Sequence, residues 1–210
     1  MIADLFLSSA DVVGPLLRGR ELAARWEEPS VLAEFRVRGL AGHLARAVFN
    51  VERYLDTDRP ADAPRLDAVR YFLAADAGET DLDGPTARAI RDRGEQAAGD
   101  GPADLAERFD AARARLAPRL AGLPADHEVV VLDRWLLPLD QALITRLVEL
   151  AVHLDDLTVS LDVPTPELPD EAADLVLITL ARIARARHGA IPLLRALSRR
   201  ERAPQVIAAF

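Results

Sequence analysis

The chain has 210 residues, half of them apolar and 29% charged, with a formal net charge of −8 at pH 7. This size and balance are typical of one folded globular domain and exclude an intrinsically disordered chain. The negative charge argues against nucleic acid or an anionic membrane as a partner, because either would repel most of this surface, and we expect small-molecule partners instead.

The absence of two residue types excludes several kinds of chemistry. The chain has no cysteine, so any thiol chemistry must use the thiol of a small molecule, and disulfides and thiolate metal sites are excluded. All 26 basic residues are arginine, which excludes a lysine Schiff base and a Walker-type phosphate loop. The N-terminal sequence lacks the pattern of a secretory signal and no apolar run is long enough to span a bilayer, so we expect a cytoplasmic location.

Apolar spacing along the N-terminal part of the chain predicts long helices. Over residues 1–26 apolar side chains recur every three or four positions, and Pro15 limits how far one straight helix can run. Ser30 is a candidate N-cap for a second long helix, whose apolar stripe continues to about Leu55. The segment 56–64, DTDRPADAP, has the proline and aspartate content of a linker.

The middle of the chain predicts shorter helices. Residues 66–77, 85–98 and 102–121 have helical patterns that are separated by glycine-containing turns. We expect them to form a long helical crossover, spanning residues 56–138, between the second and third helices of a bundle. An apolar run at residues 129–132 is too short to predict a sheet.

The C-terminal third contains the longest patterned segment. It runs from Leu139 to Leu161 and ends at a proline-rich stretch. Asp170 then begins a last long helix, which Gly189 closes after basic residues at the negative end of the helix dipole. A short C-terminal helix and tail follow in residues 190–210.

The predicted helix over residues 139–161 carries a narrow polar stripe on a mostly apolar surface. At about 100° per residue, its aliphatic side chains cover an arc of more than half the circumference. The stripe consists of five polar residues spaced three and four apart: Arg146, Glu149, His153, Asp156 and Ser160. Either the stripe faces solvent and the Glu149–His153 pair is incidental, or it turns into a bundle where these two side chains converge on one ion. The narrowness of the stripe adds weight to the second interpretation.

A further metal ligand is available on the second predicted long helix. His43, in GLAGHLARAV, lies at the edge of the apolar seam, where a histidine is also commonly a hydrogen-bonded residue at the margin of a core. Two imidazoles and one carboxylate suit Zn²⁺, Ni²⁺ or Fe²⁺, and three protein ligands leave coordination positions open for water or substrate. Glu-x-x-x-His with one distant histidine is nevertheless a weak pattern by itself.

Three stretches resemble the metal-binding domain of mycothiol-dependent maleylpyruvate isomerases, in the DinB-like superfamily. They are RWEEPSVLAEFRVRGLAGHLARAV, TRLVELAVHLDDLTVSL and RHGAIPLLRALSRRERAP, and the resemblance is vague between residues 56 and 128. It implies a single metal-binding domain over residues 1–210: an all-α, DinB-like four-helix bundle with a crossover between its second and third helices and a short C-terminal helix. It also implies that His43, Glu149 and His153 bind one divalent metal, with zinc expected before nickel or iron.

The chemistry that this resemblance implies is the addition of a small-molecule thiolate to an electrophilic carbon. A thiol with a pKa of about 8.5 is only slightly ionised near neutral pH, and coordination to a dication removes its proton. The resemblance implies that mycothiol is the thiol cosubstrate and that the chain is a metal-dependent isomerase or S-transferase. The alternative is a non-catalytic bundle that binds a ligand or partner, with its metal absent or structural. The family isomerase carries a further C-terminal domain, whereas about fifty residues follow Leu161 here, so the substrate does not carry over.

Three more polar residues are candidates around this site. Arg146, one turn from Glu149, could hold a carboxylate of the substrate or thiol, or pair with Glu149 along the helix. Asp156, one turn beyond His153, could orient the imidazole or lie on the surface. Arg134 could line the mouth of the site and bind the cosubstrate, or simply pack.

The remaining polar features predict less. His127 and His188 are expected to be structural or solvent-exposed. The three arginines near the C-terminus are expected to form a solvated tail rather than a nucleic-acid arm: Arg199, Arg200 and Arg202. The resemblance also allows a homodimer.

Overall fold

The computed structural model describes residues 1–60, 62–75 and 84–209, which are mostly helical. The helices are α1 (Ile2–Leu17), α2 (Arg20–Arg25), α3 (Val37–Asp56), α4 (Ala68–Ala75), α5 (Pro85–Ala98), α6 (Pro102–Ala121), α7 (Leu139–Leu161), α8 (Asp170–His188) and α9 (Ala190–Ser198), followed by the 3-10 helix η1 (Arg200–Arg202). Strands β1 (Glu128–Val131) and β2 (Trp135–Pro138) form an antiparallel hairpin. The all-α expectation is therefore confirmed. No helix within the described ranges is both long and apolar enough to cross a membrane.

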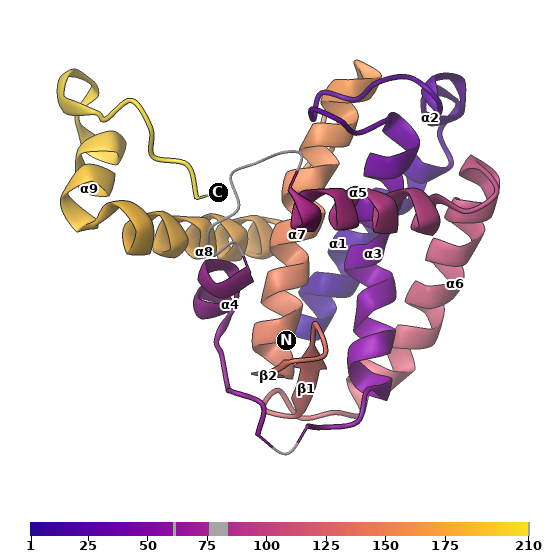
Figure 1. The fold of residues 1–210 in the computed structure, drawn as a ribbon, viewed down its shortest axis with the longest axis horizontal. Coiled ribbons are helices and arrows are strands. Elements are labelled where there is room, and N and C mark those ends of the chain that lie inside the picture. The colour runs from indigo at the N-terminus through magenta and orange to yellow at the C-terminus, as the bar shows by residue number, and fades with distance from the viewer. Residues whose placement is uncertain (61, 76–83, 210) are drawn as a thin grey trace.

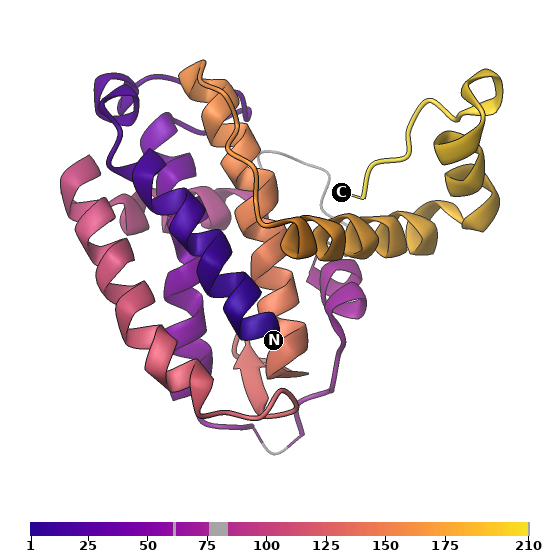
Figure 2. The ribbon, with the colours of Figure 1, turned by 180° about the vertical axis from the view of Figure 1, so that it is seen from behind.

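Four long helices, α1, α3, α6 and α7, form a bundle (Figures 1 and 2). Helices α1 and α3 each pack against both α6 and α7, so the four helices enclose one hydrophobic core. Each helix contributes fully buried side chains to this core, among them Phe6, Leu44, Phe109 and Leu147. The three- and four-residue spacing of apolar positions thus produces the expected four-helix bundle.

The crossover is shorter than the sequence pattern suggests. The pattern assigns residues 102–121 to the crossover, whereas in the structure they form α6 and pack in the bundle, because Leu105, Phe109 and Leu116 are fully buried there. The crossover between the second and third bundle helices therefore contains α4 and α5, and α7 is the fourth bundle helix. The last two predicted positions of the helix at 66–77 lie outside the described residues.

Helix α8 leaves the bundle instead of completing it. It contacts α7, α4 and α1, and its C-terminal end projects away from the bundle together with α9 (Figures 1 and 2). Its bounds agree with the sequence pattern, since it begins at Asp170 and ends before Gly189, whose φ of 89° is one that glycine adopts without strain.

Ser30 does not cap a helix. Helix α3 begins at Val37, and the residues before it form a turn closed by a bridge between Pro29 and Arg36. The Ser30 hydroxyl accepts a hydrogen bond from the Leu32 amide at 3.2 Å, so this side chain stabilises the local turn instead. A serine hydroxyl can accept a backbone N–H bond either at a helix N-cap or in a turn, so the sequence alone does not distinguish the two.

The apolar run at residues 129–132 belongs to the hairpin. Val129 pairs with Leu137 and Val131 with Trp135. The hairpin closes the end of the bundle where α7 begins. It is a two-stranded element that packing against α3 and α7 stabilises, which explains why so short a run forms strands.

Candidate metal centre

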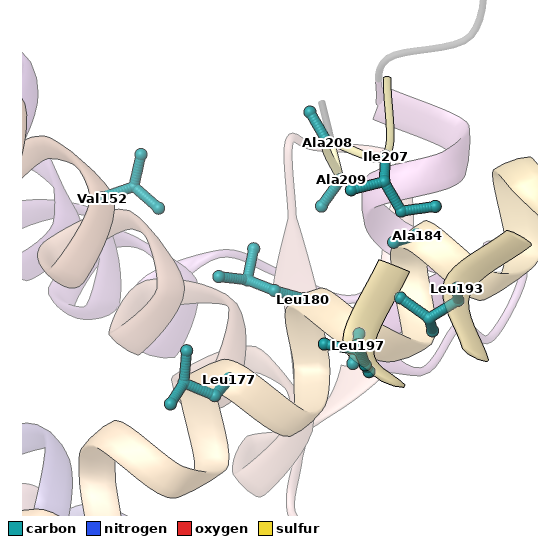
Figure 3. A pocket seen from close by; sticks show the side chains of 10 residues that line it. Val152, Leu177, Leu180, Ala184, Leu193, Leu197, Ile207, Ala208 and Ala209 are labelled. Carbon is teal, nitrogen blue, oxygen red and sulfur yellow. The ribbon is translucent and has the colours of Figure 1, made fainter. Parts of the chain in front are cut away.

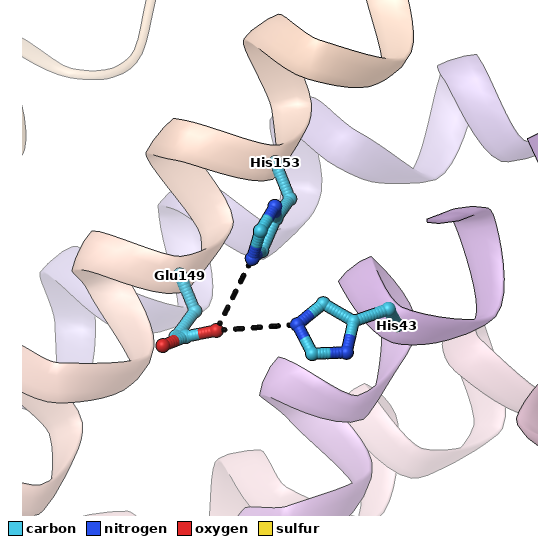
Figure 4. Close-up of side chains that lie close together, drawn as sticks. All are labelled: His43, Glu149 and His153. Carbon is cyan, nitrogen blue, oxygen red and sulfur yellow. Dashed lines mark ion pairs between the residues drawn. The ribbon is translucent and has the colours of Figure 1, made fainter. Parts of the chain in front are cut away.

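Helices α3 and α7 lie side by side and bring three candidate ligands together, His43 from α3 and Glu149 and His153 from α7 (Figure 4). Oε2 of Glu149 lies 3.6 Å from Nε2 of His43 and 3.4 Å from Nε2 of His153. One ligand atom from each residue lies within 4.8 Å of the other two. Within the described ranges, no other group of three His, Cys, Asp or Glu side chains has this spacing. The polar stripe of α7 therefore turns toward a neighbouring helix.

The separations fit ligands around a cation better than a hydrogen-bonded cluster. Both distances, 3.4 and 3.6 Å, exceed the usual range of about 2.7–3.2 Å for a nitrogen–oxygen hydrogen bond. Ligand atoms about 2.0–2.2 Å from a tetrahedral ion lie about 3.3–3.6 Å apart. Two imidazoles and a carboxylate also form a donor set that zinc, iron and nickel accept. The residues present therefore fit a divalent metal.

Burial and charge set the protonation states of the three groups. Burial alone would raise the pKa of Glu149, but its contacts with His153 and His43 and the charge of Arg146 outweigh burial and hold this pKa well below its usual value. Burial lowers the pKa of His43, which keeps this imidazole neutral at pH 7. Burial opposes protonation of His153 as well, but Asp156 and Glu149 raise its pKa to about 9. A metal would therefore displace a proton from His153 only.

Asp156 orients the imidazole of His153. Nδ1 of His153 lies 3.0 Å from Oδ2 of Asp156, one turn further along α7, so the ring can donate to this carboxylate. In the neutral ring this contact keeps the proton on Nδ1 and leaves Nε2, which faces Glu149, free to bind a cation. Of the two alternatives for Asp156, the orienting contact is the one present.

The end of the stripe also has a structural role. The Ser160 hydroxyl accepts a hydrogen bond from the backbone N–H of Val31 at 3.1 Å. This bond ties the turn before α3 to the C-terminal end of α7. The turn, which carries Phe35, is thereby held beside the candidate metal centre.

His43 is held by packing. Helix α5 crosses α3 so closely that a Cβ atom on Gly42 would lie 2.1 Å from the carbonyl oxygen of Gly94, and a Cβ on Gly94 would lie 3.4 Å from the Cβ of His43. The Phe35 ring meets the His43 ring edge to face, with centroids 6.0 Å apart. Nδ1 of His43 is buried and has no hydrogen-bond partner in the described part of the chain. Close packing around the two glycines therefore sets the direction of Nε2.

Arg146 lies beneath Glu149 and is only 4% exposed. Its guanidinium donates hydrogen bonds to the Tyr71 hydroxyl and the Thr145 hydroxyl, both at 3.1 Å, and lies 4.0 Å from Oε1 of Glu149. The pairing with Glu149 is thus present. The other alternative, contact with a carboxylate of substrate or thiol, stays a prediction.

Arg134 lies at the outer end of a chain of side-chain contacts that leads to Arg146. Its guanidinium lies 3.9 Å from the centroid of the Trp135 ring, and that ring meets Tyr71 edge to face with centroids 5.8 Å apart. Tyr71 in turn accepts the hydrogen bond from Arg146. Arg134 therefore packs on the hairpin, and its role in cosubstrate binding stays a prediction.

Sequence reasoning missed the aromatic side chains around this site. Tyr54 and Tyr71 both lie near the Arg146 guanidinium, whose central carbon is 5.8 and 5.6 Å from the two ring centroids. Tyr71 comes from the crossover, 75 positions before Arg146, and no local spacing links the two. The other histidines lie apart from the site: His127 is exposed before β1, and His188 contacts the carbonyl oxygen of Ala208 at 2.8 Å.

Comparison with known proteins identifies the family. The family model for the mycothiol maleylpyruvate isomerase N-terminal domain matches residues 10–158, a range that includes His43, Glu149 and His153. This match covers more than half of the chain, so the chain belongs to that family, and its mostly helical structure agrees with a DinB-like bundle. No curated protein and no solved structure matches the chain.

Proposed function

We propose that the chain is a divalent-metal-dependent enzyme that adds the thiolate of mycothiol to an electrophilic carbon of a small molecule. Reversible addition would isomerise a double bond, and irreversible addition would transfer the thiol. One observation carries this proposal: two imidazoles and a carboxylate from separate helices converge at metal-ligand spacing, in a domain family named for a mycothiol isomerase.

His43, Glu149 and His153 would hold the metal, and zinc suits their donor set best. When bound, the cation would supply Lewis-acid activation of the thiol, which the chain cannot supply from a cysteine of its own. The three side chains are 18–22% exposed, so small molecules can reach this edge of the bundle.

The surrounding residues would keep the three ligands in position. Asp156 holds His153 through Nδ1, and Arg146 holds the carboxylate of Glu149 from the buried side. Arg146 and Arg134 are also our candidates for contacts with an acidic group of the electrophile and with the thiol cosubstrate, respectively. The net charge of −8 supports small molecules as partners rather than nucleic acid or an anionic membrane. We further propose a cytoplasmic location, because small-molecule thiols are kept reduced there.

The test measures metal content and thiol-dependent turnover on the same preparation. We expect one divalent cation per chain. We also expect the chain to consume at least one electrophile of a panel that includes maleylpyruvate, and this consumption should require both the metal and mycothiol. His43→Ala should abolish both properties, whereas His127→Ala, which alters an exposed histidine outside the site, should leave them intact. One bound metal per chain without thiol-dependent turnover of any electrophile would refute the proposed enzymatic activity. It would favour a non-catalytic bundle that binds a ligand or partner.

A further inference from the structure

The last two thirds of α8, helix α9 and the segment after it, residues 176–209, form an arm that projects from the bundle (Figures 1 and 2). The inner face of the arm is packed, since Val176, Thr179 and Ile183 are buried. No residue of α9 is buried. Large apolar side chains of the arm face solvent: Leu177, Ile191, Leu194 and Leu197 are 63%, 55%, 60% and 76% exposed. A monomer gains nothing from exposing so many large aliphatic side chains on one element, and such a surface is typical of an interaction site.

The arm and Val152 of α7 together line an open apolar groove, with a hollow of about 370 Å³ (Figure 3). Helix α8 contributes Leu177 and Leu180 to its wall, α9 contributes Leu193 and Leu197, and the C-terminal segment contributes Ile207. Every side chain that lines the hollow is apolar. A hollow with this lining accepts an aliphatic or aromatic side chain of a partner.

Charge distinguishes the possible partners of the arm. Residues 176–209 contain seven arginines and one acidic residue, Glu201, which gives the arm a net charge of +6. The whole chain carries −8, which leaves −14 on the rest of the molecule. Two arms packed on each other would each carry a net charge of +6 and would repel. An arm packed on a bundle would bring opposite net charges together.

We propose that the arm docks on the acidic bundle of a second copy of this chain, so that two chains exchange arms in a symmetric dimer. The exposed leucines supply the apolar area of the interface, and the arginines attract the acidic bundle. The arm contains 34 residues, enough for one side of a standard interface, which uses about 20–30 residues per partner. An exchange of identical elements about a two-fold axis closes the assembly at two chains. The proposal does not depend on the metal or on catalysis.

Sedimentation velocity on the full chain over a range of concentrations tests the dimer. We expect the mass of two chains, with association that weakens as salt is raised. Leu194→Asp should weaken association at least tenfold, because it places a charge where an aliphatic side chain would be buried. The matched control is Val31→Asp, which alters an apolar side chain that is 50% exposed in the turn before α3, off both the arm and the bundle helices, and it should leave the dimer intact.

A charge-reversed arm tests which surface the arm contacts. Arg195→Glu combined with Arg199→Glu should weaken the dimer if the arm lies on the acidic bundle, and should strengthen it if two arms pack together. Circular dichroism checks that each variant keeps its helices. A wild-type chain that is monomeric at every concentration, a dimer that Leu194→Asp leaves unchanged, or one that charge reversal strengthens would overturn the proposal. A monomer whose arm binds nucleic acid or anionic vesicles would also overturn it.

Discussion

Asp156→Asn tests how the candidate metal centre is held together. In the wild-type chain, Nδ1 of His153 lies 3.0 Å from a carboxylate oxygen of Asp156, and both side chains are about one-fifth exposed. Asparagine has the same shape but no charge, so it keeps the packing and removes the charge-assisted hydrogen bond. Loss of a carboxylate behind a metal-ligating histidine lowers metal affinity about 10–100-fold, which corresponds to about 1.4–2.7 kcal/mol.

The assay for Asp156→Asn is a competition titration of Zn²⁺ against a chromophoric chelator. The matched control is Asp155→Asn, because Asp155 is the preceding residue of α7 and is exposed, where its carboxylate accepts a hydrogen bond from Thr165 instead. We expect the control to bind zinc as the wild-type chain does. A zinc affinity that Asp156→Asn leaves within twofold of wild type would refute the orienting role.

Three further predictions follow from packing, burial and the bundle core. Gly42→Ala should lower the free energy of unfolding by about 1–3 kcal/mol in chemical denaturation, because the new Cβ would lie 2.1 Å from the Gly94 carbonyl oxygen. The control Gly122→Ala should be tolerated, because its Cβ would have no contact closer than 3.8 Å. Equal effects of the two substitutions would contradict the close crossing of α3 and α5. Burial raises the pKa of Tyr54 from 10.0 to about 12, so the folded state holds this phenolic proton more tightly than the unfolded state does. The resulting stability is fully present below pH 10 and is lost as the pH rises through 12, with about 2 kcal/mol gone at pH 12 itself. A loss that persists unchanged in Tyr54→Phe would count against this assignment. Chelation, or His153→Ala, should abolish activity with little change in the helical circular dichroism, because the bundle has its own core; wholesale unfolding would make the metal structural.

The sequence predicts α7 and its polar stripe because the relevant information is local. Apolar positions spaced three and four apart define the helix, prolines bound its C-terminal side, and the narrow stripe places Glu149 one turn from His153. Helical geometry alone therefore puts these two side chains beside each other. That His43 lies opposite them required a resemblance to a known family, because nothing in the spacing of α3 specifies its neighbour.

The features that the sequence does not predict depend on contacts between distant segments. Helix α6 and helix α8 both have amphipathic patterns, but α6 packs against both α1 and α3 in the bundle, whereas α8 contacts α7, α4 and α1 and then leaves it. Tyr71 reaches Arg146 across 75 positions. Ser30 carries the side chain of a helix cap but stabilises a turn, since the same hydroxyl serves both. Local propensity cannot decide any of these cases.

The most direct test of the metal centre is the metal stoichiometry of single variants, measured by elemental analysis of the purified protein. The geometry of His43, Glu149 and His153 predicts one divalent cation per chain in the wild type and in His127→Ala. It predicts loss of that cation in each of His43→Ala, Glu149→Gln and His153→Ala, with the helices retained. A wild-type chain that binds no divalent cation, or a full complement of metal in any of these three variants, would contradict the assignment of these three residues as metal ligands.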